Sequence, residues 1–103
     1  MTNGYRFYYK GEHYTTCWTN EVAANHIHAC ADLTNKGLTP YFWHNPETGK
    51  EILTYADSFR LEKLAKDTAT VITPDNIAIL SKSIRKALAD FEYDGEEWKA
   101  KEA

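Results

Sequence analysis

Two histidines and two cysteines are spaced as His13-x3-Cys17-x8-His26-x3-Cys30. Two ligand pairs of this kind, one on a strand and one on a helix, are typical of a structural zinc site. The strand register predicted below places the first pair on the sheet face away from the aromatic core. The second pair lies in the apolar stripe of the next helix, and one helix cannot pack on both faces of its own hairpin. We therefore expect a hydrogen-bonded histidine and a buried cysteine in that helix, and no metal.

A cysteine nucleophile with a histidine base is a second catalytic arrangement to consider. Cys17 or Cys30 would be the thiolate and His26 or His28 the base, but no nearby cation or helix N-terminus lowers a thiol pKa. The five glycines are isolated from one another, so neither a phosphate-binding loop nor a dinucleotide-binding motif is present. The sequence therefore predicts no catalytic residue and no cofactor. A small enzyme or ligand-binding domain with an unrecognised His and Tyr site stays an alternative.

Cations and an aromatic ring share one face of the first predicted hairpin: Arg6, Tyr8, Lys10 and His13. Proteins that bind single-stranded nucleic acid stack bases on such rings and neutralise phosphates with such cations. An ordinary solvated sheet face has the same composition. A nucleic-acid platform is therefore kept as an alternative function.

The end of the chain combines acids with exposed aromatic rings. The residues that we expect to bind a partner are Tyr93, Asp94, Glu96, Glu97 and Trp98. Acids near a helix C-terminus oppose the helix dipole, so local stability does not explain them. An acidic and aromatic surface is suited to docking on a basic surface of another protein, with charge speeding encounter and rings supplying burial. A frayed tail kept soluble by its charge is the alternative.

The elements that must position these residues follow from periodicity and from turn and cap residues. An aromatic-rich hairpin is expected over residues 5–18, with Gly11-Glu12 as its turn. Thr19 and Gly37 bound a helix over residues 20–36. The hairpin's predicted core face carries Tyr5, Phe7, Tyr9, Tyr14, Thr16 and Trp18.

The second half of the chain is expected to repeat the order strand, strand, helix. A hairpin over residues 41–55 precedes a short helix over residues 58–65, and Thr73-Pro74-Asp75 begins a helix that runs to residue 92. The predicted fold is α+β, an antiparallel sheet of two β-hairpins covered on one face by two or three helices. Its order is ββα-ββα plus a C-terminal helix. Residues 1–95 form one domain and residues 96–103 a polar C-terminal tail.

The segment Tyr41–Lys50 resembles the middle loop of WW modules, which bind proline-rich peptides. The tryptophan and proline that complete the WW groove downstream have no counterpart here, because Ile52–Asp57 occupies their place. No binding residue is therefore carried over from that family.

Length and composition limit the class of protein. A chain of 103 residues with 43% hydrophobic and 26% charged residues is expected to fold as one domain. Its net charge of −3 gives no global basic field for nucleic acid or anionic membranes. With no signal sequence and no apolar stretch long enough for a membrane span, we expect a cytoplasmic protein with reduced cysteines.

These observations favour a small non-enzymatic protein-binding module over the two alternatives. The expected partner is another protein with a basic surface, contacted through the acidic and aromatic chain end, with no membrane contact. Such a module would be a regulator or inhibitor of a larger protein, of the type that phages and mobile elements encode.

Overall fold

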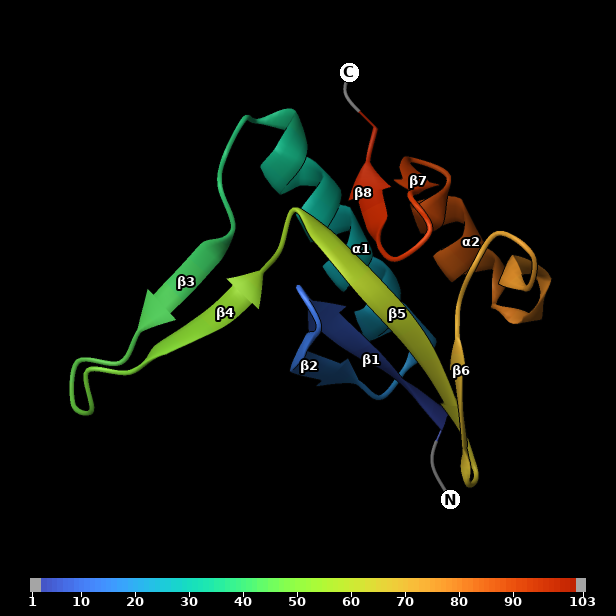
Figure 1. The fold of residues 1–103 in the computed structure, drawn as a ribbon, viewed down its shortest axis with the longest axis horizontal. Helices are drawn as coiled ribbons and strands as arrows, with labels where there is room; N and C mark the ends of the chain where they lie inside the picture. The colour runs from blue at the N-terminus through green and yellow to red at the C-terminus, as the bar shows by residue number, and fades with distance from the viewer. Residues whose placement is uncertain (1–2, 102–103) are drawn as a thin grey trace.

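The computed structural model describes residues 3–101, and within that range it contains eight strands, two α-helices and one 3₁₀ helix (Figure 1). In chain order they are β1 (Asn3–Tyr9), β2 (Glu12–Cys17), α1 (Asn20–Asn35), β3 (Tyr41–His44), β4 (Glu51–Tyr55), β5 (Ser58–Ala65), β6 (Thr68–Val71), η1 (Ile77–Ile79), α2 (Lys82–Leu88), β7 (Phe91–Tyr93) and β8 (Trp98–Ala100). The expected α+β class with antiparallel hairpins is confirmed. The expected ββα-ββα order with a third helix is not.

Six strands form the main sheet, in the order β2-β1-β5-β8-β7, with β6 also paired to β5. Every pairing is antiparallel. Residues alternate between the two faces, so Phe7 and Leu61 point to one side and Tyr8 and Arg60 to the other. Phe7 and Leu61 are fully buried, whereas Tyr8 and Arg60 are partly exposed.

Both α-helices pack on the buried face. Ile27 and Cys30 of α1 and Ile84 and Leu88 of α2 belong to one cluster with the apolar residues of β1 and β5. Thr19 caps α1 by accepting a hydrogen bond from the Val22 amide, as predicted. The result is a two-layer molecule in which the opposite sheet face has no helix over it.

The turn of the first hairpin lies one residue earlier than predicted. Lys10 and Gly11, both with positive φ, form the two-residue turn, so Tyr9 pairs with Glu12 and Tyr8 with His13. Positive φ at both positions is the geometry of a type I′ turn, which matches the strand twist. An irregularity between Phe7 and Tyr8 then shifts the register by one residue, so Tyr5 pairs with Cys17. This second shift brings Cys17 to the core side, where it is 4% exposed, and leaves Trp18, expected in the core, 58% exposed.

The segment predicted as a short helix over residues 58–65 is the strand β5. Phe59 and Leu61 are buried while Arg60 and Glu62 between and beyond them are not. This alternation has the period of a strand, and it prevailed over the weaker helical spacing of Leu61 and Leu64. The strand is central, since it pairs with β1, β6 and β8.

The long helix predicted from residue 74 to residue 92 is also wrong. The Asn76 side chain accepts from the Thr73 amide and donates to the Val71 carbonyl, which closes a loop in place of a first helical turn. Leu80 and Ser81 are extended, so α2 starts only at Lys82. The chain then turns at Asp90 into β7.

A strand occupies part of the range predicted as a polar tail. Residues Trp98–Ala100 form β8, paired with both β5 and β7. Residues 1–2 of the predicted domain and residues 102–103 of the predicted tail lie outside the described range. No helix among residues 3–101 has the length and apolar character that crossing a membrane requires.

Candidate functional site

The hairpin of β3 and β4 forms a separate two-stranded sheet that projects from the rest of the molecule (Figure 1). We call residues 41–55 the arm. Trp43 pairs with Ile52, and Phe42 pairs with Leu53 after an irregularity next to Tyr41. The structure thus confirms the predicted second hairpin and places it outside the main sheet.

The tip of the arm is held by its own hydrogen bonds. The Asn45 side-chain oxygen accepts from the Glu47 amide at 2.9 Å, and the Asn45 carbonyl accepts from the Gly49 amide at 2.8 Å. Gly49 has φ 73°, a conformation that a residue with a side chain rarely adopts. A defined turn therefore fixes the register of the two strands.

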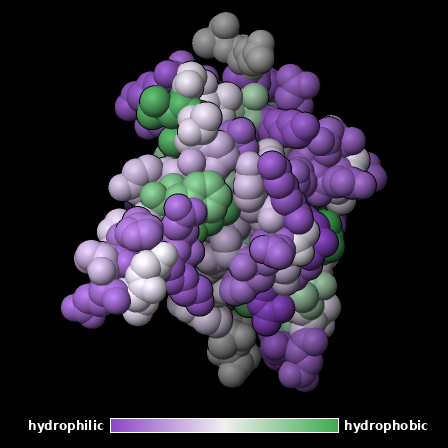
Figure 2. Space-filling model, turned by 60° about the vertical axis from the view of Figure 1, so that its left-hand side comes forward, coloured by the Kyte–Doolittle hydropathy of each residue, from purple (hydrophilic) through white to green (hydrophobic). Residues whose placement is uncertain are grey.

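The arm exposes large apolar side chains on both of its faces. Tyr41, Phe42, Trp43 and Ile52 are 45–51% exposed. Cross-strand partners share a face, so Trp43 and Ile52 lie on one side and Phe42 with Leu53 on the other. Figure 2 turns this side of the molecule forward and shows hydrophobic patches within a mostly hydrophilic surface.

The stability of the arm explains neither the exposure of its apolar side chains nor its place outside the main sheet. A two-stranded hairpin alone is marginally stable in water, and its apolar faces gain nothing while they stay solvated. Contiguous exposed apolar surface commonly marks a site of protein contact. The arm is therefore a candidate surface for protein contact.

An aromatic cluster anchors the base of the arm. The Tyr55 and His26 rings have centroids 5.3 Å apart, and the Tyr14 hydroxyl lies 2.7 Å from His26 Nε2. A groove of about 360 Å³ runs beside this cluster, between β2, the start of α1 and the end of β4. Its lining includes Val22, His26 and Tyr55. The arm thus joins the body through packed rings.

Burial keeps the groups of this cluster uncharged. Desolvation lowers the pKa of His26 to about 4 and raises the pKa of the Cys30 thiol to about 11. It also raises the Tyr14 pKa, so a protonated Tyr14 hydroxyl and a neutral His26 ring share this hydrogen bond. The cluster is a hydrogen-bonded support for the arm.

His26 makes the stability of the fold depend on pH. Its folded pKa of about 4 lies below the ordinary value of 6.5, so protons bind the unfolded state first as the pH falls. We expect the free energy of unfolding to drop by about 3 kcal/mol between pH 7 and pH 4 from this group. Urea unfolding at several pH values measures this change. The slope should flatten in His26→Gln and persist in His28→Gln, because His28 is exposed; equal slopes in both variants would contradict the assignment.

The four residues of the hypothetical zinc set are not brought together. His13 is exposed on the strand, and its Nε2 atom contacts the Thr16 hydroxyl at 2.9 Å. Cys17, His26 and Cys30 lie on the core side. Among residues 3–101 the structure has no group of three or more His, Cys, Asp or Glu side chains arranged to hold a metal ion.

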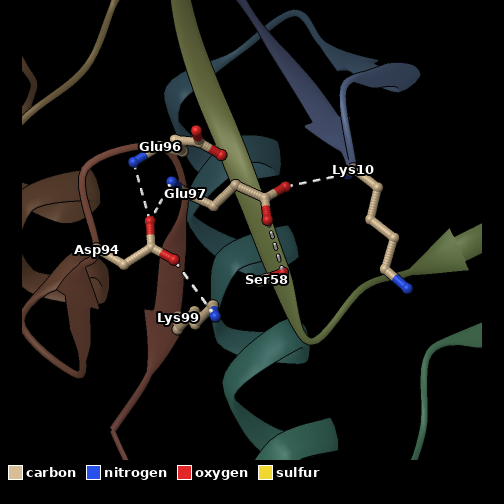
Figure 3. Close-up of polar contacts among 6 residues, drawn as sticks. All are labelled: Lys10, Ser58, Asp94, Glu96, Glu97 and Lys99. Carbon is tan, nitrogen blue, oxygen red and sulfur yellow. Dashed lines mark hydrogen bonds and ion pairs between the residues drawn. The ribbon is translucent and has the colours of Figure 1, made fainter.

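The acidic residues near the chain end have roles within the fold (Figure 3). The Asp94 carboxylate accepts from the Glu96 and Glu97 amides and pairs with Lys99. The amides of Glu97 and Glu96 hold the pKa of Asp94 below its ordinary value. Glu97 accepts from the Lys10 amide at 3.0 Å and from the Ser58 hydroxyl at 3.3 Å. These contacts close the β7–β8 turn and fasten it to the first hairpin.

Trp98, expected as an exposed ring, is buried. It is 3% exposed, and its indole N–H donates to the Ile72 carbonyl at 3.0 Å. Tyr93 packs against it with ring centroids 5.2 Å apart. The predicted surface therefore lacks its main aromatic anchor, and partner binding by this region stays a prediction.

The predicted nucleic-acid face lies on the sheet side without helices. Arg60 covers the Tyr8 ring at 4.1 Å and pairs with Glu62, and the Tyr8 hydroxyl also donates to Glu62. A base could not stack on that side of Tyr8 without displacing the guanidinium. Arg6, Lys10 and His13 are exposed. Nucleic-acid binding by this face stays a prediction.

Sequence reasoning predicted the arm as a hairpin but missed it as a site. The available signal was the run Tyr41–His44, in which consecutive apolar residues make both faces of a strand apolar. A fully buried strand has the same pattern, so the sequence alone does not distinguish the two. Comparison with known proteins finds no matching protein family, no matching curated sequence and no matching solved structure.

Proposed function

We propose that this chain is a non-enzymatic protein-binding module that docks through its arm. The observation that carries the proposal is the exposure of Tyr41, Phe42, Trp43 and Ile52 on a hairpin outside the main sheet. Tyrosine and tryptophan are enriched among the residues that contribute most to binding energy at protein interfaces. The body of the fold, with its own buried core, would present the arm to a partner.

The arrangement also suggests how the arm is used. Because both faces are apolar, a flat partner surface would cover one face and leave the other in water. Insertion into a cleft would cover both faces, and extension into a larger sheet would instead use a free strand edge. The anchored base and the closed tip limit the conformational entropy lost on docking.

Loss of the arm's aromatic surface should abolish partner capture without unfolding the body. We expect the double variant Phe42→Ser, Trp43→Ser to bind at least tenfold more weakly than the natural chain to proteins recovered from cells by affinity capture and mass spectrometry. Ile79→Ser is the matched control, because Ile79 is 52% exposed on η1, outside the arm. Circular dichroism should show the same folded signal for all three proteins.

The control variant distinguishes specific docking through the arm from nonspecific hydrophobic binding. Capture that survives in Ile79→Ser and disappears in the double variant supports the arm as the docking element. Undiminished capture by the folded double variant would contradict it and return attention to Tyr93, Glu96 and their neighbours.

A further inference from the structure

We propose that the partner of the arm is the arm of a second copy of this chain. Two β3 strands would pair antiparallel about a twofold axis, which joins the two hairpins into one four-stranded sheet. This inference rests on the proposed function, because it names the occupant of the same docking surface.

Among residues 3–101, β3 pairs only with β4, which leaves one edge of β3 unpaired. β4 occupies the other edge, and all four β3 side chains are exposed. The Asn45 amide donates to the Lys50 carbonyl, so this pair is hydrogen-bonded within the arm. Hydrogen-bonded and non-hydrogen-bonded pairs alternate along antiparallel strands. The backbone amides and carbonyls of His44 and Phe42 therefore point outward, toward the free edge.

These outward groups define one self-complementary register. In an antiparallel pairing of two copies, Phe42 of each copy lies opposite His44 of the other. The outward amides and carbonyls of both residues then form hydrogen bonds between the copies. The twofold axis then passes between the two Trp43 residues, at a non-hydrogen-bonded pair. Side chains at such a pair have Cβ atoms about 4.5–5.5 Å apart, so the two indoles would contact each other.

Charge favours this edge over the edges of β2, β4 and β7, and the other uncharged edge strand, β6, has no aromatic residue. Proteins protect strand edges from unwanted pairing with charged residues, and β2, β4 and β7 contain Glu12, Glu51 and Glu92. β3 contains no acid, lysine or arginine. Two copies of β3 would therefore meet without like charges facing each other.

The flanking residues limit the length of the pairing between two copies. Pro40 and Pro46 lie just outside β3, and proline cannot donate a ladder hydrogen bond. The pairing uses each free β3 edge once, and the Tyr55 end of β4 is packed against the body. A twofold interface of this kind is closed and does not propagate into a fibre.

The surface available corresponds to a weak dimer. Three aromatic side chains per arm are about half exposed, and each such side chain buries about 150–250 Å² when fully covered. Two arms thus carry about 450–750 Å² of exposed ring surface, of which edge-to-edge pairing covers the part that faces the second copy. This area lies below the roughly 1,000 Å² of a stable specific interface, so the backbone hydrogen bonds must contribute and we expect an affinity no tighter than micromolar.

Cysteine cross-linking tests the register in the full-length chain. Trp43→Cys should form an intermolecular disulfide under mild oxidation at least ten times faster than Phe42→Cys, because residue 43 faces itself across the axis and residue 42 does not. Phe42 is the matched control, since it lies on the same strand and is similarly exposed. The native Cys17 and Cys30 are buried and should contribute little.

Sedimentation velocity over a range of concentrations supplies the second measurement. The natural chain should shift from monomer to dimer at micromolar concentration, and Trp43→Glu should stay monomeric with unchanged circular dichroism. A dimer that survives Trp43→Glu, or equal cross-linking rates at residues 42 and 43, would overturn the proposed pairing. A monomeric natural chain that still captures proteins through its arm would overturn self-pairing but keep the proposed function. A monomer without arm-dependent capture would overturn both.

Discussion

Trp98→Ala should lower the free energy of unfolding by about 3–5 kcal/mol, as truncation of a large core side chain does. The indole is 3% exposed and its N–H donates to the Ile72 carbonyl, so the variant leaves both a cavity and an unpaired carbonyl. Urea unfolding followed by circular dichroism measures the loss.

Trp43→Ala is the matched control for this experiment. It removes the same side chain from the arm, where the indole is 45% exposed, so we expect a loss below about 1 kcal/mol. If Trp98→Ala were as mild as Trp43→Ala, β8 would not be part of the core and the segment from residue 96 onward would behave as the tail predicted from sequence.

Phe7→Ala should be equally severe, with a loss of about 3–5 kcal/mol. Phe7 is fully buried, and its ring centroid lies 4.5 Å from that of His26 and 5.1 Å from that of Phe59. Tyr8→Ala should cost less than half as much, because Tyr8 is only partly buried and its contacts are with Arg60 and Glu62 on the open sheet face. Equal losses at the two positions, measured by the same urea unfolding, would mean that the faces of β1 are reversed.

Local signals in the sequence predicted the elements that are stabilised locally. α1 has a Thr19 cap at its start and a positive φ at Gly37 after its end, and both lie where the sequence placed them. The first hairpin was predicted with its turn displaced by one residue, because Lys10 adopts a positive φ that residues other than glycine rarely take. A further register shift between Phe7 and Tyr8, which no residue pattern indicated, moved Cys17 into the core and Trp18 out of it.

Elements stabilised by distant partners were predicted wrongly. The sequence pattern of β5 predicts a short helix. The strand forms because β5 pairs with β1 and β8, which come from opposite ends of the chain. Trp98 looked exposed for the same reason, since its hydrogen-bond partner Ile72 is 26 residues away. Acids such as Glu97 resembled a docking surface because their bonds to Lys10 and Ser58 connect separate elements.

The candidate site was predictable as a hairpin and not as a surface. Apolar residues in a strand are by default assigned to a core. Whether Phe42 and Trp43 are covered depends on whether the main sheet extends to β3, and that is a property of the whole topology.

The hydrogen bond between the Lys10 amide and Glu97 also bears on the order in which the parts of the fold form. It joins residues 87 positions apart, and β8 reaches β5 only after nearly the entire chain exists. Proteins dominated by such distant contacts fold slowly, because the entropy of closing long loops is lost before the contacts form. During synthesis, which proceeds from the N-terminus, β1 and β2 are made long before the strand that completes their sheet. Until β8 arrives, the edge of β5 that receives it is open, and this interval is when the nascent chain is most exposed to mispairing.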